Sequence, residues 1–135
     1  MSDNNANAEL VERMRQVYQT GDFEEIERAA LDYWTDDTVD EFPQSGEVFK
    51  GRAAAQGFLN AYSQATGTRP SIAVREIRGR DDLWIIEGTI DYGDGTNVSS
   101  VTIAELRDGK ITRQTDYFAS PFEAPDWRRP FREEP

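Results

Sequence analysis

Residues 108–118, DGKITRQTDYF, contain a tight turn followed by a strand that carries an acid. Asp108-Gly109 is a two-residue hairpin signal, because both residues tolerate a positive φ. The alternation from Ile111 to Phe118 and the aromatic residues beside Asp116 predict a half-buried β-strand. An aspartate is seldom buried unless it is paired or hydrogen-bonded, so Asp116 belongs either to a satisfied polar network or to a working site.

Three further strands precede this one and form an antiparallel meander with it. The four predicted strands cover residues 72–77, 83–92, 98–106 and 111–118. Residues 83–86 are apolar on both faces of their strand, which is unexpected for a sheet with one solvated side. A homodimer built sheet to sheet would explain this pattern, and so would a C-terminal tail folded over the outer face.

Helices and a hairpin come before the meander. Apolar spacing, capping residues and glycine stops predict helices over residues 10–17, 22–34 and 55–62. Two short extended segments, residues 39–42 and 47–49, flank a turn-rich stretch and predict a small hairpin. Because the helices precede the sheet, the predicted fold class is α+β.

The length of 135 residues suits a single domain, residues 1–135. Residues 1–7 are polar, and we expect this N-terminus to be disordered. Residues 119–135 form a C-terminal tail rich in aromatic residues and proline, and this tail is too aromatic for a solvated linker.

Composition excludes several classes of function. The 26 acidic residues outnumber the 15 Lys and Arg, and the net charge of -11 would repel nucleic acid and anionic membranes. The chain has no Cys and no His, so thiolate nucleophiles, zinc-ribbon sites and the usual general base are absent. We expect no metal and no cofactor, and any catalysis must use carboxylates, Tyr, Lys or Arg. No secretion signal or membrane-length apolar run is present, so we expect a cytoplasmic protein.

The order of these elements resembles the nuclear transport factor 2-like superfamily, and in particular its SnoaL-like members. Three segments carry the resemblance: Thr35-Asp36-Asp37-Thr38-Val39, Phe49-Lys50-Gly51-Arg52, and Asp108-Gly109-Lys110-Ile111 leading into Asp116-Tyr117-Phe118. The resemblance implies a cone-shaped α+β fold in which three N-terminal helices pack on a curved, mostly antiparallel sheet. It also implies an apolar pocket for a small molecule at the open end and, frequently, a homodimer, which here would form through the outer sheet face.

Limonene epoxide hydrolase offers one mechanistic comparison within this superfamily. Its Arg-x-Asp strand motif resembles Thr89-Ile90-Asp91, and its second catalytic Asp corresponds to Asp116. The two acids match, whereas the arginine does not. The Tyr and Asn that hold the attacking water would fall at Val39 and Glu41, so the matched set is incomplete.

Two other relatives offer further comparisons. The general-base Asp of ketosteroid isomerase would fall at Phe42 and its oxyanion Tyr at Met14, so that site is missing. SnoaL-type polyketide cyclases use an acid/base Asp on the final strand, a role that suits Asp116. The His that assists some of them has no counterpart.

Strand alternation also supports an acid pair without reference to a family. If the face of residues 83–91 that bears Asp91 and the face that bears Asp116 line one cavity, burial and mutual repulsion would leave one acid protonated and the other ionised. Our hypothesis makes Asp116 the base and Asp91 the acid. Other pocket-lining candidates are Tyr33, Trp34, Glu41, Phe58, Tyr62, Glu87, Thr89, Gln114 and Phe118.

The candidate residues also suit purely structural roles. Asp91 equally suits a turn-capping role beside residues 93–95, and Glu41 and Glu87 suit solvated positions or pairing with Arg. The aromatic candidates suit the core. Two functional classes therefore stay open: a cofactor-free acid/base enzyme of the cyclase, isomerase or epoxide-hydrolase type, or a non-catalytic module that binds a small apolar ligand or dimerises.

Overall fold

The computed structural model describes residues 3–133 of the chain. Its elements in chain order are α1 (Asn4–Tyr18), α2 (Phe23–Leu31), β1 (Trp34–Phe42), β2 (Glu47–Lys50), α3 (Arg52–Thr66), β3 (Ser71–Arg80), β4 (Leu83–Asp91), β5 (Asn97–Arg107), β6 (Lys110–Ala119) and a short 3₁₀ helix (Asp126–Phe131). None of the helices in this range has the length and apolar character of a membrane span.

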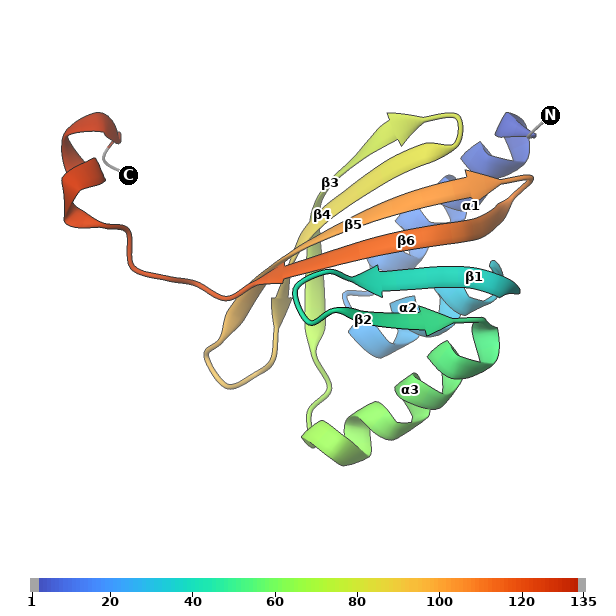
Figure 1. Ribbon diagram of the computed structural model, residues 1–135, viewed down its shortest axis with the longest axis horizontal. Coiled ribbons are helices and arrows are strands. Elements are labelled where there is room, and N and C mark those ends of the chain that lie inside the picture. Colours follow the sequence, from blue (N-terminus) through green and yellow to red (C-terminus); the bar gives the residue numbers. More distant parts are fainter. Residues whose placement is uncertain (1–2, 134–135) are drawn as a thin grey trace.

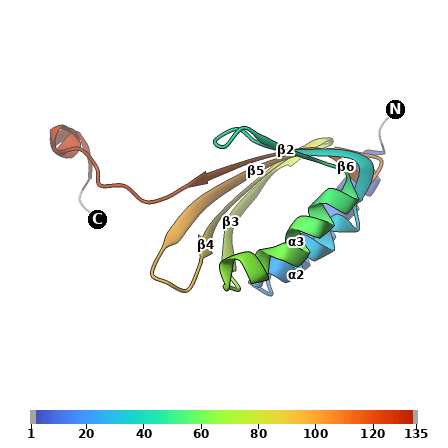
Figure 2. The same ribbon diagram turned by 60° about the horizontal axis from the view of Figure 1, so that its bottom comes forward.

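The strands form one six-stranded sheet in the order β2-β1-β6-β5-β4-β3. All neighbours are antiparallel except β1 and β6, which run parallel. Figures 1 and 2 show the sheet curving over α1, α2 and α3. The predicted α+β class and the curved sheet over three helices are therefore confirmed. The hairpin β1–β2 extends the meander of β3 to β6 instead of standing apart from it.

The turn between β5 and β6 has the expected backbone conformation. Asp108 has φ 51° and Gly109 has φ 77°, the left-handed values that a two-residue turn requires. The turn also receives a contact from α1, since Gly109 N donates to Asn7 Oδ1 at 2.8 Å. This contact ties the N-terminal helix to the end of the hairpin.

The predicted disorder of residues 1–7 is wrong for the part that the structure describes. Helix α1 begins at Asn4, because the Asp3 side chain accepts hydrogen bonds from Asn5 N and Ala6 N. Asn7 is fully buried and donates from Nδ2 to Asp81 O at 3.2 Å. A polar side chain buried against two hairpin turns leaves no apolar signal in the sequence, so this first helical turn went unpredicted.

Replacement of Asn7 provides a test of this anchor. Asn7→Ala is expected to destabilise the fold by about 1–3 kcal/mol, because Gly109 N and Asp81 O would lose their partner. Urea unfolding measures the change. Asn5→Ala, on the exposed side of the same helix, is the control, and equal stability of the two variants would contradict the assignment.

The registers of the sheet decide which side chains face the helices. Ile86 lies opposite Thr102, and Thr102 lies opposite Asp116, so these three residues form a row on the inner face. Residues of β4 with odd numbers, including Leu83 and Asp91, consequently lie on the outer face. The prediction that the Asp91 face and the Asp116 face line one cavity is wrong for this reason.

The C-terminal tail leaves the body of the protein. After β6 the chain runs away from the sheet and forms the 3₁₀ helix Asp126–Phe131 (Figure 1). Phe122, Trp127 and Phe131 are 77%, 70% and 83% exposed. The tail therefore does not fold over the outer face of its own sheet, which was one explanation for the apolar residues 83–86.

Candidate acid–base site

A cavity of about 210 Å³ lies between the inner face of the sheet and helices α2 and α3. Its size falls below the ~300–1,000 Å³ of pockets for drug-sized ligands, so it suits a small molecule. The wall combines apolar and aromatic side chains with three acids. The acids are Glu27 from α2, Asp40 from β1 and Asp116 from β6.

Six aromatic rings form a continuous arc along the wall of this cavity. Each ring contacts the next with centroids 5.2–6.1 Å apart. The geometry is stacked at one end of the arc and tilted or edge-on along the rest, which is typical of aromatic packing. From β6 through β1, β2 and α3 to α2, the rings are those of Phe118, Phe42, Phe49, Phe58, Tyr62 and Phe23.

Asp116 is held by two side chains of the sheet. Its Oδ1 accepts from Thr102 Oγ1 at 2.5 Å, and its Oδ2 accepts from Gln114 Nε2 at 3.5 Å. Strand β6 pairs with β5 on one side and β1 on the other, so the backbone under Asp116 is fixed from both sides. Each oxygen of Asp116 therefore accepts a hydrogen bond from a neighbouring side chain.

Asp40 is the second acid and is 7% exposed. Its Oδ2 accepts from Gln114 Nε2 at 3.4 Å, whereas its Oδ1 is buried without a hydrogen-bond partner in the described chain. Burial raises the pKa of Asp40 to about 10, with hydrogen bonding to Asp116 and repulsion from Asp116 and Glu27 adding to the rise. Asp40 therefore carries a proton at neutral pH beside the acceptor Asp116.

Glu27 and Tyr18 extend this group of acids toward the helices. Burial raises the pKa of Glu27 to about 8, and the charge of Asp116 contributes. Burial also raises the pKa of the Tyr18 hydroxyl, with smaller contributions from Glu27 and Asp116. Asp40 and Glu27 thus hold, at neutral pH, protons that exposed carboxyl groups would have released.

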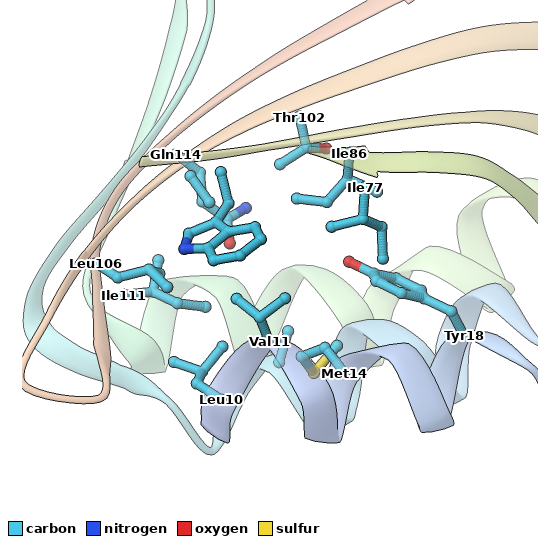
Figure 3. A pocket seen from close by; sticks show the side chains of 13 residues that line it. Leu10, Val11, Met14, Tyr18, Ile77, Ile86, Thr102, Leu106, Ile111 and Gln114 are labelled. Carbon is cyan, nitrogen blue, oxygen red and sulfur yellow. The ribbon is translucent and has the colours of Figure 1, made fainter. Parts of the chain in front are cut away.

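Tyr18 lines a second, smaller cavity of about 50 Å³ between α1 and the sheet. Figure 3 shows its hydroxyl pointing into this space, above Val11 and Met14 of α1. Thr102 lines both cavities, and Gln114 lines the smaller one. The small cavity therefore lies directly behind the side chains that hold Asp116.

The structure brings several of the residues predicted for the site together. Trp34, Phe58, Tyr62 and Phe118 line the larger cavity with Asp116. Gln114 contacts both acids of the pair. Tyr33 instead packs against the hydrophobic core as a partly buried residue.

Four other predicted residues lie outside the cavity. Asp91 is exposed, and its Oδ1 accepts from Gly93 N at 2.8 Å, so it caps the turn after β4. Thr89 is exposed on the same outer face. Glu87 pairs with two arginines of β3, and Glu41 pairs with Arg113. The structure does not bring these four residues to Asp116.

Sequence reasoning missed Asp40 and Glu27. Asp40 precedes Phe42 by two residues. Alternation therefore places both on one strand face, once β1 is known to run from Trp34 to Phe42. Glu27 follows Phe23 by one helical turn and shares its face. Both signals depend on knowing that these faces line a cavity.

The three acids of the cavity do not form a metal site. Within residues 3–133, no group of three or more Asp, Glu, His or Cys side chains is arranged to hold a metal ion. Each acid comes from a different element and faces apolar or aromatic walls. In this geometry the acids can therefore exchange protons with a ligand or form hydrogen bonds to it.

Comparison with known proteins places this fold in a family. The family model for SnoaL-like domains matches residues 11–114. The chain belongs to the SnoaL-like domain family. No curated protein is significantly similar to it in sequence.

Solved structures agree with the SnoaL-like assignment. An NTF-2 like protein of unknown function from Burkholderia xenovorans is 33% identical with a TM-score of 0.74, over 94% of this chain and 96% of that one. A putative ketosteroid isomerase from Kribbella flavida is 20% identical with a TM-score of 0.75, over 99% and 93%. A putative SnoaL-like polyketide cyclase from Shewanella denitrificans is 13% identical with a TM-score of 0.60, over 79% and 88%. The last two show the shared fold alone.

Proposed function

We propose that this SnoaL-like protein is a cofactor-independent acid–base enzyme that acts on a small, mainly apolar molecule. The observation that carries the proposal is the pair of Asp40 and Asp116, bridged by the Gln114 amide inside one aromatic cavity. One member carries a proton and the other accepts hydrogen bonds, which is the arrangement that general acid–base catalysis requires. Asp40 takes the role of acid that the sequence suggested for Asp91.

The chemistry follows from the two protonation states. Asp116 removes a proton from a carbon next to a carbonyl, and the electron pair of that C–H bond moves toward the carbonyl oxygen. Asp40 donates its proton to this oxygen, so an enol forms and the charge on the acid pair is conserved. Return of a proton to another carbon, or attack of the enol on a second carbonyl, gives an isomerase or a cyclase reaction. Opening of an epoxide has less support, because Asp91 and Glu41 lie outside the cavity.

The test uses small cyclic ketones as probes, without knowledge of the natural substrate. Wild-type protein in D₂O is expected to speed exchange of the ketone α-protons above the buffer rate, and proton NMR measures this exchange. Binding of the ketones without any faster exchange would support the second candidate, a non-catalytic ligand-binding protein. The largely apolar and aromatic wall and the small volume of the cavity favour that candidate in such a case.

We also propose that the protein forms a homodimer through the outer face of its sheet. Leu83 and Tyr117 are 46% and 41% exposed there, next to the partly buried Ile85, Val101 and Ile103. The pairings of Ile85 with Ile103 and of Val101 with Tyr117 make these residues contiguous across three strands. A second copy of this face, related by a two-fold axis, would cover the apolar rows.

A charge in the middle of this face tests the dimer. Val101→Lys is expected to weaken dimerisation by at least about tenfold, because a lysine would be buried without a partner. Sedimentation velocity over a concentration series measures the change. Gln56→Lys, at an exposed position of α3, is the matched control. A wild-type protein that stays monomeric at every concentration would contradict the proposal.

A further inference from the structure

We propose that the cavity selects an organic cation, a small molecule with a protonated or quaternary nitrogen that Glu27 and the aromatic arc hold together. The aromatic arc is the set of six rings defined above. This inference rests on the proposed function, since it names the substrate class of the same site. Asp40 and Asp116 remain free to act on the uncharged part of the ligand.

The first support is the charge type of the side chains that line the cavity. Three acids line it, and no Lys or Arg does. Neighbouring arginines have acidic partners elsewhere: Arg28 contacts Glu24 at 3.0 Å, and Arg113 contacts Glu41 outside the cavity. A negative ligand would find no Lys or Arg here, whereas a cation would find acidic side chains.

The second support is the unpartnered oxygen of Asp40. This side chain is 7% exposed and lines the cavity, and its Oδ1 has no hydrogen-bond partner in the described chain. A buried polar atom in this state is costly unless something occupies the space beside it. An unmet acceptor at Oδ1 keeps the wall around Asp40 electronegative, which favours a positive group in the cavity over a negative one.

The third support is the aromatic arc beside Glu27. Ring faces attract cations through their quadrupole, and several rings around one cation form the kind of cage that binds quaternary ammonium groups. Phe23 lies one helical turn before Glu27 on α2 and contacts Tyr62 of α3 with ring centroids 6.1 Å apart. A cation at Glu27 therefore contacts a carboxylate and aromatic rings together.

Glu27 also makes the selection dependent on pH. A cation favours the ionised form of Glu27, whose pKa burial raises to about 8, so affinity rises by about tenfold between pH 7 and pH 9. The other titratable groups near Glu27 come from α1, outside this cavity, and from β1, α3, the β4–β5 turn and β6, which line it. They are Tyr18, Asp40, Tyr62, Tyr92 and Asp116. Burial raises the pKa of Tyr18 and of Tyr62, which keeps both hydroxyls neutral over this range.

The experiment compares two probes of the same shape. Choline and 3,3-dimethyl-1-butanol differ in one central atom, a positive nitrogen against a neutral carbon. Isothermal titration calorimetry at pH 9 is expected to show choline binding at least about tenfold more tightly, and the preference should shrink at pH 7. Glu27→Gln should remove most of the preference and its pH dependence. Glu25→Gln, at an exposed position of the same helix, is the control and should leave both unchanged.

Each outcome decides between the two proposals. Equal or tighter binding of the neutral alcohol, or no binding of choline at either pH, overturns the cation inference. The ketone exchange assay then still decides the proposed function, because it needs no charge on the probe. If Glu27→Gln does not fold, the pH dependence of choline binding by the wild-type protein is the deciding measurement, and a flat profile overturns the inference.

Discussion

Asp116→Asn is expected to slow ketone α-proton exchange by about 10²–10⁴-fold relative to the wild-type protein. The amide has the same shape and can still contact Thr102 and Gln114, so the fold and the cavity persist. It cannot accept the carbon-bound proton, however, and the pair with Asp40 loses its base. Initial rates of deuterium incorporation, followed by NMR at constant pH, measure the effect.

Asp91→Asn is the matched control for this prediction. It makes the same chemical change on an exposed acid of the neighbouring sheet region, where an asparagine can still accept from Gly93 N. Its exchange rate should equal that of the wild-type protein. An Asp91 variant as slow as the Asp116 variant would contradict the assignment of the base, and so would an Asp116 variant with full activity.

Asp40→Asn is expected to be more stable than the wild-type protein at pH 8 and nearly equal to it at pH 4. The folded state holds the Asp40 proton with a pKa of about 10, whereas the unfolded chain releases it near the ordinary value of 3.8. The stabilising contribution of this proton is complete below pH 3.8 and is lost as the pH rises toward 10. An asparagine removes this loss and can donate to Asp116 in place of the acid proton.

The expected gain at pH 8 is at least about 1 kcal/mol, which corresponds to about 3–5 °C in melting temperature for a domain of this size. Thermal unfolding at pH 4, 6 and 8 measures it. The same Asp91→Asn variant serves as the control and should follow the wild-type curve at every pH. A difference between Asp40→Asn and wild type that stays constant from pH 4 to pH 8 would show that burial does not perturb this acid.

Local patterns in the sequence were sufficient for most of the fold. Strand alternation, helix-capping residues and the turn at Asp108-Gly109 each depend on neighbouring residues, and the structure has the corresponding elements, including a cap at Asp22 before α2. The start of α1 was missed because its anchor, Asn7, is a buried polar residue whose partners Asp81 and Gly109 lie far along the chain.

The site was harder to predict, because it depends on which face of each strand points inward. Alternation correctly separates Asp91 from its even-numbered neighbours but does not say which set is buried. That choice is made by the long-range register of β4 with β5 and of β5 with β6. Asp40 joins Asp116 only because β1 pairs in parallel with β6, a contact between segments more than seventy residues apart.

The separation of the acids from two of the six rings of the aromatic arc has a consequence for protein engineering. Helix α3 contributes Phe58 and Tyr62 to the cavity but contains no Asp or Glu, whereas the acids stand on β1, β6 and α2. A library of variants restricted to α3 would therefore reshape the cavity while leaving every carboxyl group in place. Substrate preference and proton transfer can be evolved one after the other in this scaffold, beginning with the helix.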